Sequence, residues 1–136
     1  MKNFILKPLI LLLLSTLGVT QSCQKTEETT ELQKCDLKAK ELLTIEDKTA
    51  TLIYTNKLGS INIANAGYFI VNHNLNQIPL PLRICNFPTT KYPSLKIGEN
   101  MKINFSGRIE ILPETVDALS TNIELTKIMK IDEENN

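Results

Sequence analysis

The stretch MKINFSGRIEI, residues 101–111, decides the fold class of this chain. Its odd-numbered positions hold apolar side chains, with Gly107 as the one exception, and its even-numbered positions hold polar or charged side chains. Alternation with a period of two is typical of a β-strand that has one face in a core and the other in solvent. A glycine on the inner face lets such a strand coil strongly, as the strands of a barrel must. The stretch therefore predicts a long, bent barrel strand.

Shorter segments with strand character lie on both sides of this stretch. They are rich in β-branched or alternating apolar residues, and turns that contain Asn and Gly separate the first of them. In the last segment the parity of the apolar positions shifts near Thr126, which predicts a β-bulge. The candidate strands are residues 49–55, 61–64, 68–71, 78–85 and 123–131, and the candidate turns are residues 56–59 and 65–67.

Prolines and helical spacing modify this pattern. Pro79 and Pro81 cannot donate to a ladder, so the first half of the 78–85 strand is expected at a sheet edge or outside the sheet. A proline opens residues 113–119 and suits the first position of a helix, which predicts a short helix before the last strand. Residues 32–43 carry apolar side chains at helix-like spacing, which allows a short helix or a segment that leads into a strand.

The N-terminal residues have the character of an export signal. Two lysines precede an apolar run at residues 9–19, which is too short for a membrane span of roughly 20 residues. Residues 19–23 resemble a lipobox, where signal peptidase II cuts before a cysteine that carries diacylglycerol. The resemblance implies that residues 1–22 are a lipoprotein signal peptide and that Cys23, with its acyl chains such as palmitate, is the mature N-terminus. The alternatives are a transmembrane anchor and an ordinary secreted protein.

A polar tract follows Cys23. Residues 24–31 contain no apolar side chain, so residues 23–34 are expected to form a flexible, lipid-anchored tether. Within this tract Gln24, Lys25, Glu27 and Glu28 resemble the surface-export signal of Bacteroidetes lipoproteins. The resemblance implies an outer-membrane lipoprotein that faces the medium. The alternatives are a plain solvated linker and a periplasm-facing lipoprotein.

Five or six short strands joined by small turns predict an all-β fold, namely a small antiparallel barrel or sandwich with one short helix before its last strand. A single domain is expected at residues 35–136, and its core is near the lower limit for independent stability. Cys35 and Cys85 form an even pair in a compartment that tolerates disulfides. They are expected either to form a disulfide or to remain two buried thiols that pack as small hydrophobes.

The strand pattern also resembles small OB-like domains found in lipoproteins of the same bacteria. The stretches that carry the resemblance are Gly67-Tyr68-Phe69-Ile70, Asn86-Phe87-Pro88, and Gly98 with residues 103–109. The resemblance covers roughly residues 48–131. It implies an OB-like barrel and carries no assigned activity.

The charge balance limits the classes of partner. The chain has 15 Lys and Arg and 15 Asp and Glu, and two of the basic residues belong to the signal, so the mature net charge is about −2. A nucleic-acid binder would show a basic patch, so no nucleic acid is expected as a partner. The same balance argues against electrostatic attachment to a membrane and leaves the lipid on Cys23 as the anchor.

His73 is the only histidine of the chain and lies in the polar stretch of residues 72–77. No nucleophile motif accompanies it, so a solvated loop histidine is expected rather than a member of a catalytic triad. The remaining cysteines and His73 lack the paired spacing of a metal site. Adjacent carboxylates such as Glu46 and Asp47 point to opposite faces of a strand and rarely converge on one substrate. The sequence therefore predicts no enzymatic activity, no cofactor and no metal.

The predicted function is that of a small, surface-exposed binding module for a protein partner. Residues 86–95, with Phe87 and Tyr92, are the expected rigid contact loop, although the same rings would also serve to cap the barrel. One alternative is an inhibitor-type lipoprotein that blocks a hydrolase through an exposed loop. Another is an oligosaccharide- or oligonucleotide-binding OB-like domain that uses Arg83 and Arg108 together with aromatic residues.

Overall fold

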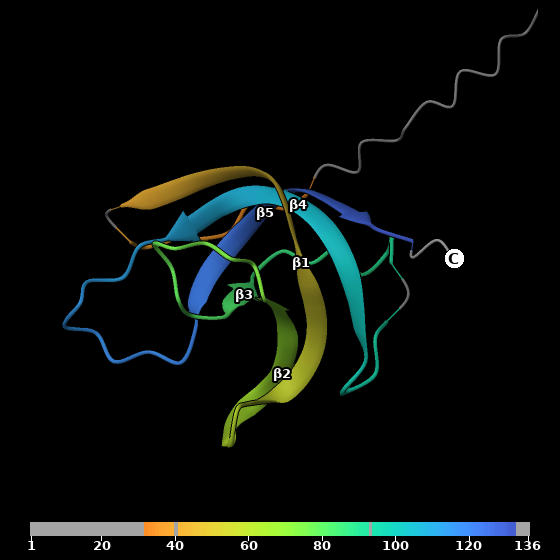
Figure 1. Cartoon of the computed structure of the whole chain (residues 1–136), viewed down its shortest axis with the longest axis horizontal. Coiled ribbons are helices and arrows are strands. Elements are labelled where there is room, and N and C mark those ends of the chain that lie inside the picture. The colour runs from red at the N-terminus through yellow and green to blue at the C-terminus, as the bar shows by residue number, and fades with distance from the viewer. Residues whose placement is uncertain (1–31, 40, 93, 133–136) are drawn as a thin grey trace, which may run out of the picture.

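The computed structural model describes residues 32–39, 41–92 and 94–132. Within these ranges the chain forms five β-strands and no helix (Figure 1). The first two strands make a hairpin whose far end projects from the rest of the sheet. The strands are β1 (Leu42–Leu58), β2 (Ile61–Val71), β3 (Leu82–Ile84), β4 (Asn100–Glu110) and β5 (Thr121–Lys130).

The strands pair in the order β1-β2-β3-β5-β4, and β4 pairs back to β1, so the sheet closes on itself as a barrel. The ladder between β3 and β5 is parallel, and the other ladders are antiparallel. The predicted all-β class is confirmed, whereas the prediction of a fully antiparallel sheet is wrong. The reason is geometric. Five strands cannot alternate in direction all the way around a ring, because an odd number leaves two neighbours that point the same way.

β4 is the strand that the sequence predicts most clearly, and that prediction is confirmed. Ile103, Phe105 and Ile109 are fully buried on its inner face. The strand pairs with β1 along one edge and with β5 along the other, so it must coil. Gly107 makes this coiling feasible, because a Cβ at this position would lie 2.5 Å from the backbone oxygen of Glu124. The rest of the core comes from Ile45, Ala50, Leu52, Ile70, Ile78, Leu82, Ile84, Ile123, Leu125 and Ile128.

The structure contradicts the helix expected at residues 113–119, and of the two alternatives for residues 32–43 it contains the segment that leads into a strand. Residues 113–119 make a single turn, in which Val116 N donates to Pro113 O over 2.9 Å, and Val116 remains exposed. An exposed apolar side chain offers this segment no packing, and a short helix needs packing to be stable. Of residues 32–43, the described residues before β1 form no helix. Backbone amides there donate to carboxylates of other strands instead of to carbonyls within a helix.

The predicted bulge in the last strand is confirmed. Ser106 pairs with Lys127 and Gly107 pairs with Leu125, which leaves Thr126 as the extra residue of β5. A bulge adds local twist to a strand. It therefore lies directly beside the glycine at which β4 coils.

The predicted turn at residues 65–67 is wrong, because β2 continues through it. The sequence signal nevertheless marks an irregularity in the hairpin. Thr55 pairs with Gly67 and Lys57 pairs with Asn62, so the register between β1 and β2 slips in this region. Small residues that favour a turn here permit a bulged strand instead.

Two further expectations about breaks in the strands agree with the structure in part. Of the turn expected at residues 56–59, only Gly59 lies in the turn, because β1 continues to Leu58; its φ of 61° suits glycine. Of the candidate strand 78–85 only Leu82–Ile84 pairs with neighbours. Pro79 and Pro81 lie ahead of β3 and outside the ladder, as expected of residues without an amide donor.

We expect Gly107→Ala to lower the free energy of unfolding by about 1–3 kcal/mol, as overpacking of a filled core does. The added methyl group would meet the backbone of β5, which cannot move without breaking its own ladder. Urea denaturation of the purified protein measures the change. Gly67→Ala is the matched control, because its Cβ would meet its nearest neighbour, a Phe69 ring carbon, at an ordinary 3.4 Å. Equal losses in the two variants would contradict this explanation.

Candidate functional site

The connection from β2 to β3, residues 72–81, which we call the Asn loop, is organised around His73. Leu75 N donates to His73 Nδ1 over 3.2 Å, and Nε2 lies 2.9 Å from Leu80 O. Because Nδ1 accepts, the proton of the neutral ring is on Nε2, which donates to Leu80 O. The side chain is 8% exposed. The prediction of a solvated loop histidine is therefore wrong, since the ring is an internal clamp that joins the two halves of the loop.

The backbone of the Asn loop is fixed by its residue types as well. Asn72 and Asn74 adopt φ angles of 54° and 50°, in the left-handed region that asparagine tolerates better than most residues do. Ile78 N donates to Leu75 O over 3.0 Å and closes a turn within the loop. Proline rings then fix φ in the last part of the loop. The loop is thus restrained at its start, its middle and its end.

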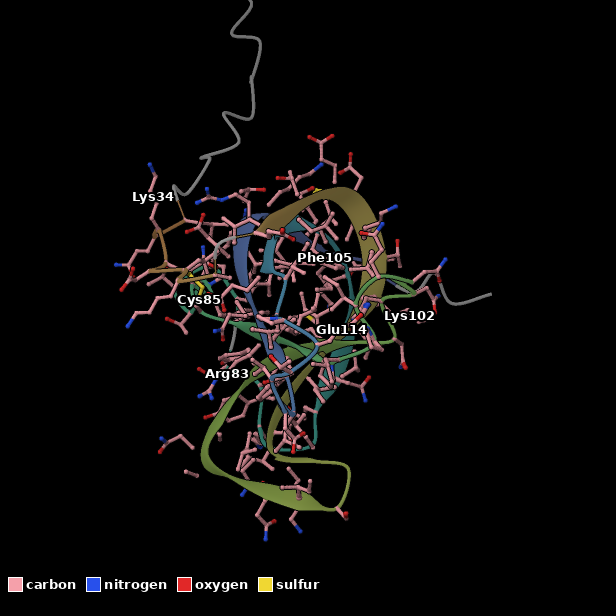
Figure 2. All side chains as sticks on the ribbon, turned by 90° about the vertical axis from the view of Figure 1, so that its left-hand side faces the viewer. Lys34, Arg83, Cys85, Lys102, Phe105 and Glu114 are labelled. Atoms are coloured by element: carbon pink, nitrogen blue, oxygen red, sulfur yellow. A yellow bond between two sulfur atoms is a disulfide. The ribbon has the colours of Figure 1, made fainter. Side chains whose placement is uncertain are left out.

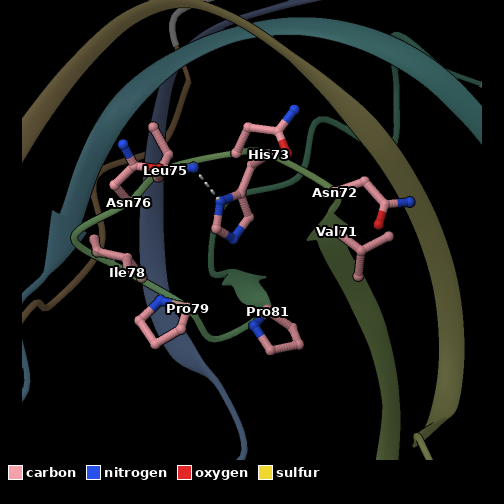
Figure 3. A pocket seen from close by; sticks show the side chains of 9 residues that line it. Val71, Asn72, His73, Leu75, Asn76, Ile78, Pro79 and Pro81 are labelled. Atoms are coloured by element: carbon pink, nitrogen blue, oxygen red, sulfur yellow. Dashed lines mark hydrogen bonds between the residues drawn. The ribbon is translucent and has the colours of Figure 1, made fainter.

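The Asn loop curls around a hollow of about 480 Å³ (Figure 3). Three asparagines line it, together with apolar residues and His73, whose ring lies within the curl of the loop in the same view. The hollow is open to solvent and lies beyond the end of β2. The asparagines are Asn72, Asn74 and Asn76, and the apolar lining includes Ile78, Pro79 and Pro81.

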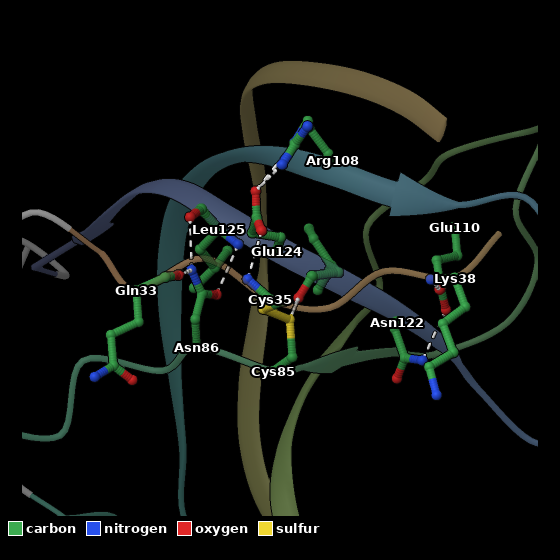
Figure 4. Close-up of a disulfide and its surroundings, with 11 residues drawn as sticks. Gln33, Cys35, Lys38, Cys85, Asn86, Arg108, Glu110, Asn122, Glu124 and Leu125 are labelled. Carbon is green, nitrogen blue, oxygen red and sulfur yellow. Dashed lines mark hydrogen bonds and ion pairs between the residues drawn. A yellow bond between two sulfur atoms is a disulfide. The ribbon is translucent and has the colours of Figure 1, made fainter. Parts of the chain in front are cut away.

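A second feature is the segment of residues 32–39, which we call the strap, because it lies against the barrel without forming a strand. A disulfide joins Cys35 of the strap to Cys85, which directly follows β3, with 6.0 Å between the Cα atoms (Figure 4). Of the two alternatives for these cysteines, the structure contains the disulfide. The cross-link joins positions 50 residues apart. Closing a loop of that length contributes about 4 kcal/mol in the chain-entropy account.

Two buried carboxylates hold the strap by its backbone (Figure 4). Glu124 Oε2 accepts from Cys35 N over 2.6 Å, and Glu110 Oε1 accepts from Lys38 N over 2.8 Å and from Ala39 N over 3.2 Å. Glu110 and Glu124 are only 6% and 3% exposed. A buried carboxylate is stable only with hydrogen-bond partners, so the strap and the two glutamates depend on each other. Sequence reasoning missed these residues, because each reads as a solvated charge on the outer face of a strand.

Asn86 is a further link between the strap and β5, in addition to the disulfide and the two glutamates. Its Nδ2 donates to Gln33 O over 2.7 Å and to Leu125 O over 2.9 Å, while its Oδ1 accepts from Leu125 N. Leu32 packs against the core cluster. Leu32 and Gln33, which the sequence assigns to the tether, therefore lie against the barrel.

The predicted contact loop uses its aromatic rings to pack on the barrel. The Phe87 ring stacks on Tyr68 with 3.8 Å between centroids, and the Tyr92 hydroxyl donates to Ile128 O over 2.8 Å. Both rings are half-buried against the core cluster. Thr89 and Thr90, between them in the loop, are exposed. The rings thus fix the shape of a loop whose free surface consists of its polar residues.

The two arginines named for oligonucleotide binding already have partners. Arg108 forms an ion pair with the buried carboxylate of Glu124. The guanidinium of Arg83 lies 5.8 Å from the centroid of the Phe69 ring, within the range of a cation–π contact. Figure 2 shows Lys34, Arg83 and Lys102 apart from one another, so the labelled basic side chains do not gather in one place.

Some predicted residues remain without a structural account. Cys23, Gln24, Lys25, Glu27 and Glu28 lie outside the described residues.

The following absences concern residues 32–39, 41–92 and 94–132. No group of three or more His, Cys, Asp or Glu side chains gathers there in a way that could hold a metal ion. The same ranges hold no helix of the length and apolarity that a membrane crossing requires. Asp47, one of the paired carboxylates, forms an exposed ion pair with Lys127 at 2.8 Å. Comparison with known protein families, with curated proteins and with solved structures finds no match for this chain.

The environment of Glu124 favours its ionised form. Burial raises the pKa of this carboxyl, but the hydrogen bonds from Arg108 and from the backbone of Cys35, together with the charge of Arg108, outweigh burial. The pKa therefore lies below its ordinary value of 4.5. A carboxyl whose pKa falls on folding contributes stability above its unfolded pKa, and that stability is lost as the pH falls toward the folded value.

We expect His73→Ala to destabilise the Asn loop by about 1–3 kcal/mol, because it leaves Leu75 N and Leu80 O without their partner. Limited proteolysis should then cut within residues 72–81 under conditions in which the parent protein is intact. Gln77→Ala, which alters an exposed side chain of the same loop, is the control. Unchanged cleavage in His73→Ala would show that the ring is not the clamp.

We expect Glu124→Gln to lower the free energy of unfolding by about 1.5–3 kcal/mol at neutral pH, because hydrogen bonds to a charged group are lost. The gap between the variant and the parent should close as the pH falls from the ordinary carboxyl value of 4.5 toward the lowered pKa of Glu124, because the parent carboxylate then also becomes protonated. Thermal unfolding followed across this pH range measures both effects. Glu114→Gln changes an exposed carboxylate and is the control. A gap that stays constant with pH would contradict the assigned role of the charge.

Proposed function

We propose that this protein is a lipid-anchored, non-enzymatic binding module with an OB-like barrel, held at the outer membrane and facing the medium. The lipid on Cys23 is the anchor, and residues 24–28 are the export tract. The five-stranded ring of β1 to β5 supports the OB-like assignment, since OB folds are five-stranded Greek-key barrels. Such barrels present their ligand surfaces on loops and on one strand face.

The observation that carries the proposal is the strap. A domain held from its N-terminal side needs a firm attachment where the tether meets the barrel. Here that point is secured by the Cys35–Cys85 disulfide and by amide-to-carboxylate hydrogen bonds. Any pull on the tether therefore reaches the barrel through a covalent bond rather than through a strand edge that could unzip.

The length of the tether fits this arrangement. Leu32 follows Cys23 by nine residues. A chain of that length spans at most about 30 Å when it is fully extended. The anchored barrel would stand close to the membrane with its strap toward the lipid. Several acyl chains, each stabilised by about 0.8 kcal/mol per buried CH₂, would hold it there.

The binding role is supported by two loops of fixed shape. The Phe87 and Tyr92 rings hold the 86–92 loop against the barrel and leave Thr89, Thr90 and Lys91 exposed for contact. A groove of about 280 Å³ lies between this loop and the start of the strap. A preorganised loop loses little conformational entropy on binding, which favours association.

We expect Cys23→Ala to move the protein from the membrane fraction to the soluble fraction, because the anchor is lost. On intact cells, external protease should remove the parent domain. A triple variant, Lys25→Ala, Glu27→Ala and Glu28→Ala, should be protected while it stays in the membrane fraction. Immunoblots of fractionated and protease-treated cells measure both effects. Membrane retention of Cys23→Ala would refute the anchor, and equal protection of the parent and the triple variant would refute the export tract.

A further inference from the structure

We infer that the Asn loop is a binding site for a neutral saccharide. This inference rests on the proposed binding role and names a ligand for it at a separate place. The loop holds the hollow described above, which opens to solvent beyond the end of β2 (Figure 3).

The lining matches hydroxyl groups. Each of Asn72, Asn74 and Asn76 offers a carbonyl oxygen that accepts and an NH₂ group that donates. A sugar hydroxyl both donates and accepts, so one amide can make two hydrogen bonds with neighbouring hydroxyls. No side-chain hydrogen bond joins these three amides to other described residues. Their hydrogen-bonding groups are therefore available to a ligand.

The apolar side of the hollow complements the C–H face of a sugar ring. Ile78, Pro79 and Pro81 are the apolar residues of its lining in the second half of the loop. A site that places a few polar groups around an apolar floor orients its ligand by hydrogen bonds and holds it by burial. An alternation of polar and apolar surface is also what a pyranose ring presents.

The backbone that carries the amides is held in place before any ligand arrives. His73 joins the two halves of the loop by its hydrogen bonds to Leu75 N and Leu80 O. Asn72 and Asn74 are fixed in left-handed backbone conformations on either side of it. Such preorganisation reduces the entropy lost on binding a flexible, weakly held ligand. The ring of His73 is thus a positioning group, and both of its nitrogens are occupied.

Charge excludes other ligand classes. The residues that line the hollow include no Asp, Glu, Lys or Arg. A phosphorylated or sulfated ligand would require basic groups, and a cationic ligand would require carboxylates or aromatic faces. An acyl chain would require a dry, apolar cavity rather than an open hollow lined by amides. A neutral polyhydroxylated ligand remains.

The test uses the full lipoprotein in detergent micelles, titrated by calorimetry with maltotriose, cellotriose and chitotriose. Sulfated lactose is the anionic probe. We expect at least one neutral trisaccharide to bind and the sulfated probe to bind at least about tenfold more weakly. Asn72→Gly with Asn74→Gly keeps the positive φ angles but removes two amides, and should weaken binding at least about tenfold. Gln77→Ala is the matched control, because it removes an exposed amide that does not line the hollow.

Three outcomes would overturn the inference. They are the absence of heat with all three neutral probes at about 10 mM, equal binding of the sulfated probe, and unchanged affinity in the double glycine variant. Melting curves establish that the double variant is folded. The proposed function is judged separately by the protease experiment on cells. A domain that is exposed on cells but binds no trisaccharide refutes the saccharide site alone.

Discussion

The close approach of β4 and β5 at Gly107 is the constraint on which the rest of the structure depends. A side chain at this position would collide with the backbone of Glu124. Its absence lets β4 coil far enough to pair with β1 on one side and β5 on the other. The bulge at Thr126 adds twist at the same place. A side chain at position 107 would push β4 away from β5 and so weaken the closure of the ring.

The close approach of β4 and β5 also affects the outer face of the barrel. As β5 passes Gly107, the side chain of Glu124 turns away from the core and meets the strap and Arg108 (Figure 4). A buried carboxylate left without partners would destabilise the fold. The strap supplies backbone amides to it and to Glu110, and the disulfide keeps those amides in place. The strap thus belongs to the folded domain although it forms no part of the sheet.

Under the proposed function, this arrangement would separate attachment from recognition. The strap fastens the barrel on the side where the proposed anchor lies, and it uses hydrogen-bonding groups that are then unavailable to ligands. The Asn loop and the 86–92 loop have internal fastenings of their own, His73 in one and the ring of Tyr92 in the other. The backbone that carries their exposed polar groups is therefore held in place. In this account the barrel supplies rigidity, and its loops supply the surface for binding.

The sequence by itself determined what depends on neighbouring residues. The alternation around Phe105, the inner glycine and the bulge near Thr126 all follow from a local period of two, and the prolines before Leu82 follow from a missing donor. For Cys35 and Cys85 the sequence left two possible states, a disulfide or two buried thiols.

Only the tertiary structure decided what depends on partners distant in sequence. The strap amides find carboxylates 72 and 89 residues away, which no local pattern encodes and which favour the strand-leading alternative over a helix. His73 reads as a solvated residue because its neighbours are polar, yet the path of the loop buries its ring. The parallel ladder between β3 and β5 arises only when five strands close into a ring. Local sequence defines the strands, but ring closure and long-range hydrogen bonds define their arrangement.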